Sequence, residues 1–136
     1  RLYSMKLNQR LGLDLNGEAT PVIKNTKSRS WSGLSLPWMA IGYETKLAPI
    51  HTLTFYNAVA NGGTMVRPRL VKEIVFHGKS IKTFEPEVIE AAICSKSTIS
   101  KAKSMLLGVV ERGTAINIKN NLYKIAGKTG TADPGF

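Results

Sequence analysis

The chain has 136 residues, of which 43% are apolar, so it is long enough to bury one core and is not compositionally disordered. It begins at Arg1 with no signal peptide and holds no run near the roughly 20 apolar residues of a membrane span, so we expect a piece of a longer protein. The net charge of +10 comes from scattered Lys and Arg residues, and the densest basic groups are not interleaved with aromatic residues. This pattern argues against a nucleic-acid partner and suits a domain near an anionic cell wall or membrane.

The first third of the chain predicts a short helix followed by a long irregular segment. A thin apolar pattern over residues 1–11 is compatible with one helical face. Residues 12–39 are rich in Gly, Pro, Asn and Ser and show little periodicity. This segment carries Trp31 and Trp38, which we expect to pack against parts of the domain outside this chain rather than cover a cleft.

Residues 49–61 have the clearest helical pattern of the chain. Proline suits the first turn of a helix, and Asn61-Gly62-Gly63 supplies a left-handed stop. Four residues recur at helical spacing and are expected on the buried face: Ile50, Leu53, Asn57 and Ala60. The pattern therefore predicts a buried helix.

A hairpin and a second helix are predicted next. Residues 66–76 and 80–84 flank the turn-like His77-Gly78-Lys79, and Pro68 marks an edge or a strand start. From about residue 96 to 111, apolar residues lie three and four apart, which predicts a helix that Gly113 ends. Ser95 or Ser97 is available as its N-terminal cap.

The strongest functional signal is the sequence Gly-Lys-Thr-Gly-Thr-Ala at residues 127–132, which follows a short apolar run. On the strand that we expect there, Lys128 and Gly130 would share one face, and Thr129 and Thr131 the other. A cation, two hydroxyls and two glycines suit contact with an anionic ligand that lies close to the backbone.

Three interpretations compete for this hexapeptide. A phosphate-binding loop is excluded because Leu122 stands where that motif requires its first glycine. A solvated turn remains possible for an isolated Lys-Thr-Gly tripeptide. The third interpretation is the Lys-Thr-Gly strand of serine enzymes that act on penicillin and peptidoglycan. Wider context has to decide between the last two.

Five segments in the right order and spacing supply that context. The chain resembles the C-terminal part of class B penicillin-binding protein transpeptidase domains, and the resemblance covers nearly its whole length. The matching segments are residues 11–18, 42–50, 57–68, 111–115 and 127–132.

The resemblance implies an α+β fold, a partial transpeptidase or serine β-lactamase-like domain in which helices pack with part of an antiparallel sheet. Residues 1–136 would form the C-terminal portion of one such domain. The part that bears the nucleophile, and the last strands and helix of the domain, are expected to lie outside this chain.

The resemblance also implies a chemistry for the hexapeptide. A serine would attack the penultimate D-Ala carbonyl of a peptidoglycan stem peptide and form an acyl-enzyme, which β-lactams trap. Lys128 would organise the catalytic network, and the backbone N–H of Thr131 would be an oxyanion donor. Thr129 and Thr131 would hold the terminal carboxylate, and Gly130 would let the substrate backbone lie against the strand.

The family's partners, cofactors and location are implied in the same way. The expected ligands are a stem peptide ending in D-Ala-D-Ala and β-lactams, with other cell-wall synthesis proteins as partners of the parent protein. No cofactor and no metal is expected; His51 and His77 have no ligand-type residues at metal-binding spacing. The parent would be membrane-anchored, with this domain in the bacterial cell envelope, on the periplasmic or extracytoplasmic side.

Departures from the family pattern limit what the chain alone is expected to do. The Ser-x-x-Lys match at residues 100–103 ends only 25 residues before Lys128 and falls on the predicted second helix, so we interpret it as a solvated helix face. A Ser-x-Asn motif is absent, and Ala48 stands where relatives carry a capping Thr. Cys94 has no nearby base and is expected to be a small buried residue. We therefore expect the parent to be an enzyme and this piece to be inactive, the alternative being a penicillin-interactive sensor without turnover.

Overall fold

The structure is a computed structural model that describes residues 1–130, and it divides into two compact units, Arg1–Ile93 and Cys94–Phe136. The first unit holds, in chain order, β1 (Val22–Ile23), α1 (Ser35–Ala40), β2 (Thr45–Lys46), α2 (Pro49–Ala60), β3 (Met65–Val66), β4 (Glu73–Phe76), β5 (Lys79–Thr83) and β6 (Val88–Glu90). The described part of the second unit holds α3 (Lys96–Arg112) and a 3-10 helix (Ile116–Ile118). Helices combined with antiparallel two-stranded sheets, ordered β1-β2, β3-β6 and β4-β5, agree with the predicted α+β class.

The helix predicted over residues 1–11 is wrong, because this segment forms a series of turns. Lys6 has a left-handed backbone with φ of 58°, which breaks any helix at that point. Leu7 and Leu11 are nevertheless buried, at 7% and 5% exposed. Turns rather than a helix therefore bring Leu7 and Leu11 into the core, whereas Leu2 and Met5 are only half-buried.

Most of residues 12–39 is irregular as predicted, but two elements interrupt it. β1 pairs antiparallel with β2, and α1 starts at Ser35, whose side chain is fully buried. Trp38 lies in α1 and makes an edge-to-face contact with Tyr43, with ring centroids 4.8 Å apart. That contact lies within the chain, so the predicted packing of Trp38 against parts outside it stays a prediction.

Helix α2 forms where predicted, and its C-terminus is stopped as predicted. Gly62 and Gly63 have φ of 69° and 104°, and the Gly63 N–H donates to the Ala58 carbonyl at 2.8 Å. The predicted buried face is wrong: Leu53 is 63% exposed, while the buried positions are His51, Thr54, Ala58 and Val59. Because the helix is apolar around much of its circumference, spacing alone did not identify the face that packs on β3.

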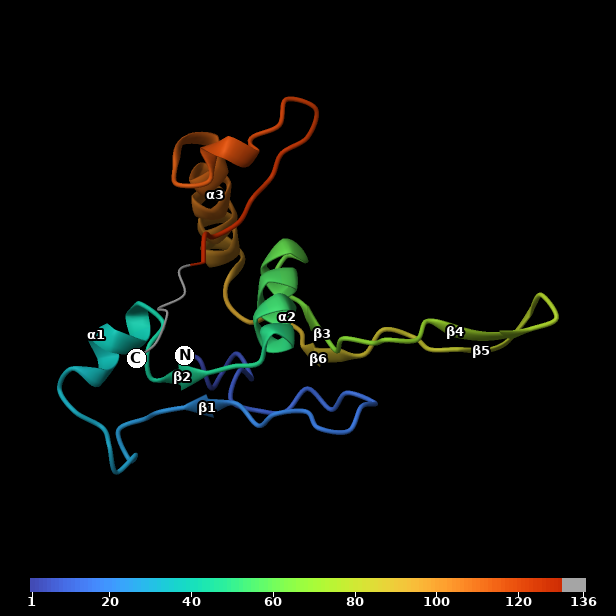
Figure 1. The fold of residues 1–136 in the computed structure, drawn as a ribbon, viewed down its shortest axis with the longest axis horizontal. Coiled ribbons are helices and arrows are strands. Elements are labelled where there is room, and N and C mark those ends of the chain that lie inside the picture. The colour runs from blue at the N-terminus through green and yellow to red at the C-terminus, as the bar shows by residue number, and fades with distance from the viewer. Residues whose placement is uncertain (131–136) are drawn as a thin grey trace. The chain divides into compact units, whose positions relative to one another are not determined.

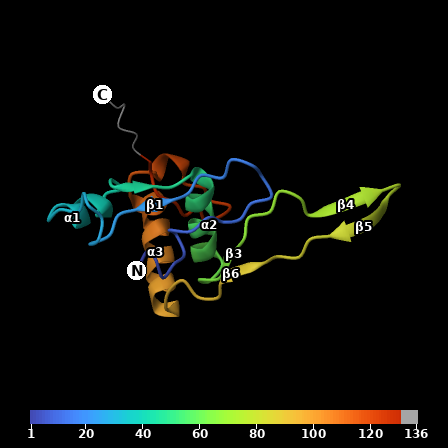
Figure 2. The same ribbon diagram turned by 90° about the horizontal axis from the view of Figure 1, so that it is seen from below.

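The first unit's central contacts link α2 to the β3–β6 ladder. Met65 on β3 is 1% exposed, and Ala58 on α2 is completely buried. The Ile93 N–H donates to the Gly63 carbonyl at 2.9 Å, which ties the segment after β6 to the end of α2. Figure 2 shows α2 beside β3 and β6, with β4 and β5 extending away from them.

The predicted hairpin is confirmed, with a shorter first strand and a second strand that begins one residue earlier than expected. His77 and Gly78 both have positive φ, 47° and 75°, the conformation that a two-residue hairpin turn requires. β4 begins only at Glu73, five residues after Pro68. All residues of both strands are exposed.

Helix α3 in the second unit is confirmed, including its cap. The Ser95 hydroxyl accepts a hydrogen bond from the Thr98 N–H at 3.2 Å. Ile99 and Val110 are buried, at 4% and 1% exposed, so the helix is anchored near both ends. Cys94, just before the cap, is half-buried. Among the described residues, none of the helices has the length and apolar character needed to traverse a bilayer.

Candidate functional site

The Lys-Thr-Gly segment follows α3 in the second unit, and the structure describes it up to Gly130. The predicted strand is not formed: residues 124–130 have no regular secondary structure. A strand exists through its ladder to a neighbour, and the described residues of this unit contain no other strand. One backbone bond fastens the segment, from the Gly127 N–H to the Leu106 carbonyl on α3 at 3.1 Å. Thr131, predicted to supply an oxyanion N–H and a hydroxyl, lies outside the described residues.

Lys128 and Thr129 do not point to opposite faces as a strand would require. The Lys128 ammonium instead turns back onto its neighbour, donating to the Thr129 carbonyl at 2.8 Å and to the Thr129 hydroxyl at 3.3 Å. Lys128 and Gly130 are exposed, whereas Thr129 is half-buried. The two side chains therefore present one cation and one hydroxyl together, an arrangement that can bind a carboxylate.

Thr114 joins this pair, and sequence reasoning did not assign it a role. Its hydroxyl lies 3.2 Å from the Thr129 hydroxyl, so a hydrogen bond links the loop after α3 to the Lys-Thr-Gly segment. The available signal was its place in the matching segment at residues 111–115. Thr114, Lys128 and Thr129 are called the ammonium–hydroxyl cluster below.

Gly113, at the end of α3, positions Thr114. A larger residue there would force the backbone to move. A Cβ on Gly113 would lie 2.8 Å from the Val109 carbonyl oxygen and 2.9 Å from the Val109 Cα. The Ala115 N–H then donates to that same carbonyl at 3.0 Å, and Ala115 is buried at 8% exposed. The close approach of backbone to backbone thus directs the chain into the cluster.

Glu111 orders the loop that leads from α3 to the candidate site. Its carboxylate pairs with the ammonium groups of Lys119 at 2.7 Å and Lys124 at 3.2 Å. Hydrogen bonds from Lys119 and then Lys124 outweigh the effect of desolvation and hold the pKa of Glu111 below its ordinary value. The carboxylate therefore stays ionised at neutral pH and ties residues 119–124 to the helix end.

A second organised region lies in the first unit, in the matching segment at residues 11–18. The Glu18 carboxylate accepts three consecutive backbone N–H groups, from Leu11, from Gly12 at 2.9 Å and from Leu13 at 3.0 Å. Burial raises the pKa of Glu18, but these N–H groups and the neighbouring His51 together bring it below its ordinary value. Glu18 thus folds the loop around its own carboxylate.

His51 and Arg67 hold the same loop from other elements. His51, on α2, is 1% exposed, and its Nε2 lies 3.9 Å from the Glu18 carboxylate. The Arg67 guanidinium donates to the Leu11 carbonyl, to the Gly12 carbonyl at 3.1 Å and to the Glu87 carboxylate at 2.7 Å. Glu18 and Arg67 belong to the matching segments at residues 11–18 and 57–68, but sequence reasoning assigned no role to either.

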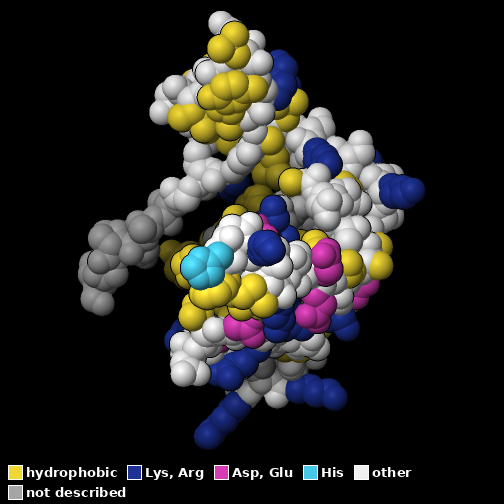
Figure 3. Space-filling view, turned by 90° about the vertical axis from the view of Figure 1, so that its right-hand side faces the viewer, with side chains coloured by type: hydrophobic (Ala, Val, Ile, Leu, Met, Phe, Trp, Pro, Cys, Tyr) yellow, Lys and Arg dark blue, Asp and Glu magenta, His cyan; other side chains and the backbone are white. Residues whose placement is uncertain are grey.

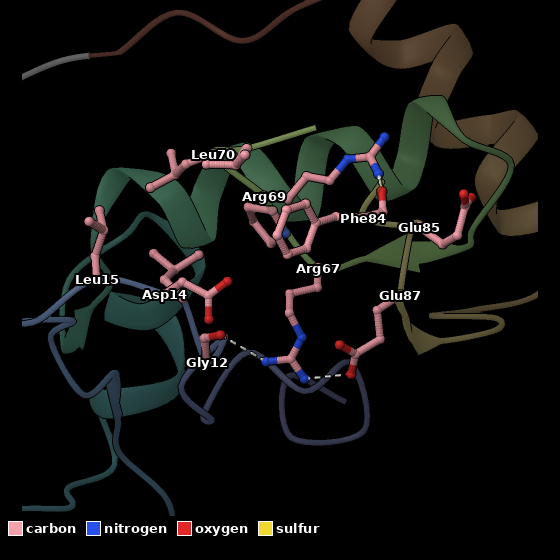
Figure 4. Close-up of a pocket in the computed structure, with 12 residues that line it drawn as sticks. Gly12, Asp14, Leu15, Arg67, Arg69, Leu70, Phe84, Glu85 and Glu87 are labelled. Atoms are coloured by element: carbon pink, nitrogen blue, oxygen red, sulfur yellow. Dashed lines mark hydrogen bonds and ion pairs between the residues drawn. The ribbon is translucent and has the colours of Figure 1, made fainter. Parts of the chain in front are cut away.

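A pocket of about 650 Å³ lies between the loop of residues 11–18 and the base of the β4–β5 hairpin. Figure 4 shows Asp14 and Leu15 on one side and Phe84 on the other, with Arg67 reaching from beneath to Gly12 and Glu87. Within the described residues, no group of three or more His, Cys, Asp or Glu side chains is arranged to hold a metal. The pocket has both apolar and charged walls, and the loop folded around Glu18 forms one of them.

The described fold is an α+β domain, and its ammonium–hydroxyl cluster brings one cation and two hydroxyls together beside the end of α3. The model of the penicillin binding protein transpeptidase domain family matches residues 2–135, so the chain belongs to that family. The class B assignment drawn from the five segments is confirmed.

The relatives agree with this assignment. Penicillin-binding protein PbpB of Mycobacterium tuberculosis is 32% identical over 96% of this chain, which covers 20% of that protein. Stage V sporulation protein D of Bacillus subtilis is 29% identical over 91% of the chain, covering 19% of that protein. The chain thus spans about a fifth of the length of these curated relatives.

Solved structures have the same fold. Penicillin binding protein 3 of Mycobacterium tuberculosis, complexed with ampicillin, matches with a TM-score of 0.66 and 28% identity, over 82% of this chain and 24% of that one. Penicillin-binding protein 2B of Streptococcus pneumoniae, at 24% identity, matches in fold alone, with a TM-score of 0.77 over 96% of this chain and 22% of that one.

Proposed function

We propose that this chain is part of a peptidoglycan D,D-transpeptidase of the cell envelope, and that it supplies the carboxylate-binding wall of the active site. The observation that carries the proposal is the ammonium–hydroxyl cluster within a chain that matches the transpeptidase family over residues 2–135. The parent would cross-link stem peptides ending in D-Ala-D-Ala and bind β-lactams, as the ampicillin complex of a 28% identical relative suggests.

The proposed chemistry is acyl transfer through a serine that another part of the parent supplies. That serine would attack the substrate carbonyl and release D-Ala, and an amine from a second stem peptide would then take the acyl group. Lys128 would provide positive potential, and the Thr129 and Thr131 hydroxyls would bind the substrate carboxylate. The Thr131 N–H would donate to the oxyanion, and Gly130 would leave space for the substrate backbone.

Ser100 is not the proposed nucleophile, although it begins a Ser-x-x-Lys sequence. It lies on α3 and is exposed, as are Lys101 and Lys103. It belongs to a solvated helix face. We therefore propose that the 136-residue chain alone is inactive.

Penicillin acylation tests these assignments. In the parent protein, Lys128→Ala should slow labelling by a fluorescent penicillin about a hundredfold, the range seen when one stabilising group of an acyl-transfer site is removed. Ser100→Ala is the matched control and should label at the wild-type rate. Unchanged labelling of the Lys128→Ala parent would remove Lys128 from the site.

The isolated chain provides a second test. Offered the same penicillin, the purified 136-residue protein should remain unlabelled. A covalent adduct on Ser100 would contradict both the inactivity and the role given to α3. Labelling of the parent without release of D-Ala from a stem peptide would instead favour the alternative, a penicillin-interactive sensor.

A further inference from the structure

The β4–β5 hairpin exposes apolar side chains on both of its faces. The exposed fractions are 46% for Ile74, 53% for Val75, 63% for Phe76 and 66% for Ile81. Alternation along β4 places Ile74 and Phe76 on one face and Val75 on the other. A partner that docked on one face would leave the opposite apolar face in water, so the hairpin suits surroundings that contact both faces at once.

Basic side chains accompany these apolar ones. Between residues 72 and 83, three lysines (Lys72, Lys79 and Lys82) stand against one glutamate, Glu73, and all four are exposed. Figure 3, which looks at the molecule from the side of the hairpin turn, shows hydrophobic and Lys or Arg side chains next to one another there. The hairpin therefore combines an apolar surface with positive charge.

The edges of the hairpin disfavour a partner that would add a strand. A register shift between Ile74 and Val75 interrupts the ladder. Lys79 and Lys82 lie on β5, whose outer edge is open among the described residues. Irregular ladders and edge lysines are features that discourage strand addition.

A lipid interface matches all of these features. It surrounds an inserted tip on every side, accepts apolar side chains at the boundary of the acyl chains, and offers anionic headgroups to lysines. Lysine stems can lie along apolar surface while their ammonium groups reach the headgroups. The open backbone edges restrict insertion to the hydrated interface, because unpaired N–H and C=O groups are not tolerated in hydrocarbon.

We propose that the β4–β5 hairpin binds the interface of an anionic membrane, with Phe76 and Ile81 at the acyl boundary and Lys79 and Lys82 at the headgroups. The inference does not depend on the proposed function, because vesicle binding is measured without acylation. Penicillin labelling and vesicle binding can therefore fail independently.

Vesicle cosedimentation with the full 136-residue chain tests the proposal. Vesicles of phosphatidylcholine with about a quarter phosphatidylglycerol should bind the chain, and Lys79→Ser with Lys82→Ser should weaken this binding about thirtyfold, as expected for two basic residues. Phe76→Ser with Ile81→Ser should weaken it by a similar factor of about thirty through the lost apolar burial. Circular dichroism of each variant checks that it is folded.

A matched control separates the hairpin from exposed apolar surface elsewhere on the chain. Leu36 and Ile41 are 67% and 73% exposed, so Leu36→Ser with Ile41→Ser removes a comparable apolar surface elsewhere and should leave binding within about a factor of two. Equal loss in this variant and in the Phe76 and Ile81 variant would overturn the proposal. Absence of wild-type binding to the anionic vesicles would do so too, as would self-association of the chain that the Phe76 and Ile81 variant abolishes.

Discussion

Replacing Gly113 by alanine should destabilise the second unit, whereas the same replacement at Gly108, five residues earlier, should stabilise it. At Gly113 the new methyl group would lie 2.8 Å from a backbone oxygen and 2.9 Å from a backbone Cα, both of Val109. Neither atom is the end of a flexible side chain, so the helix terminus itself has to move. Overpacking of this kind typically costs about 1–3 kcal/mol.

Gly108 supplies the matched control because it lies inside the same helix. The nearest atom to its added Cβ would be Arg112 Nη2 at 3.5 Å, an ordinary van der Waals contact at the end of a mobile side chain. Alanine in a helix interior is favoured over glycine by about 0.5–1 kcal/mol. The two substitutions add the same methyl group and should change the free energy of unfolding in opposite directions.

Urea unfolding followed by circular dichroism measures both effects. With a slope of about 1–3 kcal/mol per molar urea, Gly113→Ala should lower the unfolding midpoint by about 1 M, and Gly108→Ala should raise it by a few tenths of that. A midpoint for Gly113→Ala equal to or above that of the wild type would refute the steric argument. Such a result would mean that the helix end adjusts without cost, so that Gly113 does not determine where Thr114 lies.

Three other features of the structure lead to further predictions. Ala48→Thr should raise the melting temperature, with a gain of about 1 kcal/mol, because α2 starts with an extended Ala48 whose side chain caps nothing; an unchanged melting temperature would contradict this. Glu111→Gln should reduce stability more at pH 7 than in acid. The folded pKa is depressed, so the carboxylate's contribution is full above its ordinary pKa and is lost as pH falls through the lower folded value. Urea midpoints that stay parallel across that range would argue against it. Thr114→Val should slow penicillin acylation of the parent several-fold without changing the urea midpoint, because the Thr114 hydroxyl lies 3.2 Å from that of Thr129. A lowered urea midpoint that accounts for the slower acylation would mean that Thr114 has only a structural role.

Local sequence signals, each spanning only a few residues, were enough to predict several elements. The Ser95 cap bonds to a residue three positions away, and the glycines after α2 and the His77-Gly78 turn adopt the positive φ that their sequence favours. These choices depend on neighbours within about five residues, so they can be recognised without knowledge of the fold. The five matching segments likewise identified the family.

Long-range packing decided the remaining features. The buried face of α2 is set by β3 and by Glu18, which lies far away in the sequence, and an apolar helix circumference gave no preference among its faces. The strand predicted at Lys128 is absent for the same reason. A β-strand forms only against a second strand, and local sequence does not show whether one lies beside it.

The sequence by itself determined the family, both principal helices, the hairpin, and the residue types Lys128 and Thr129 of the candidate site. Only the tertiary structure brought Thr114 to Thr129, 15 positions along the chain, and the Arg67 guanidinium to the Leu11 carbonyl, 56 positions away. The reason is that a capping group or turn acts on its own backbone, whereas these partners meet only after the intervening chain has folded.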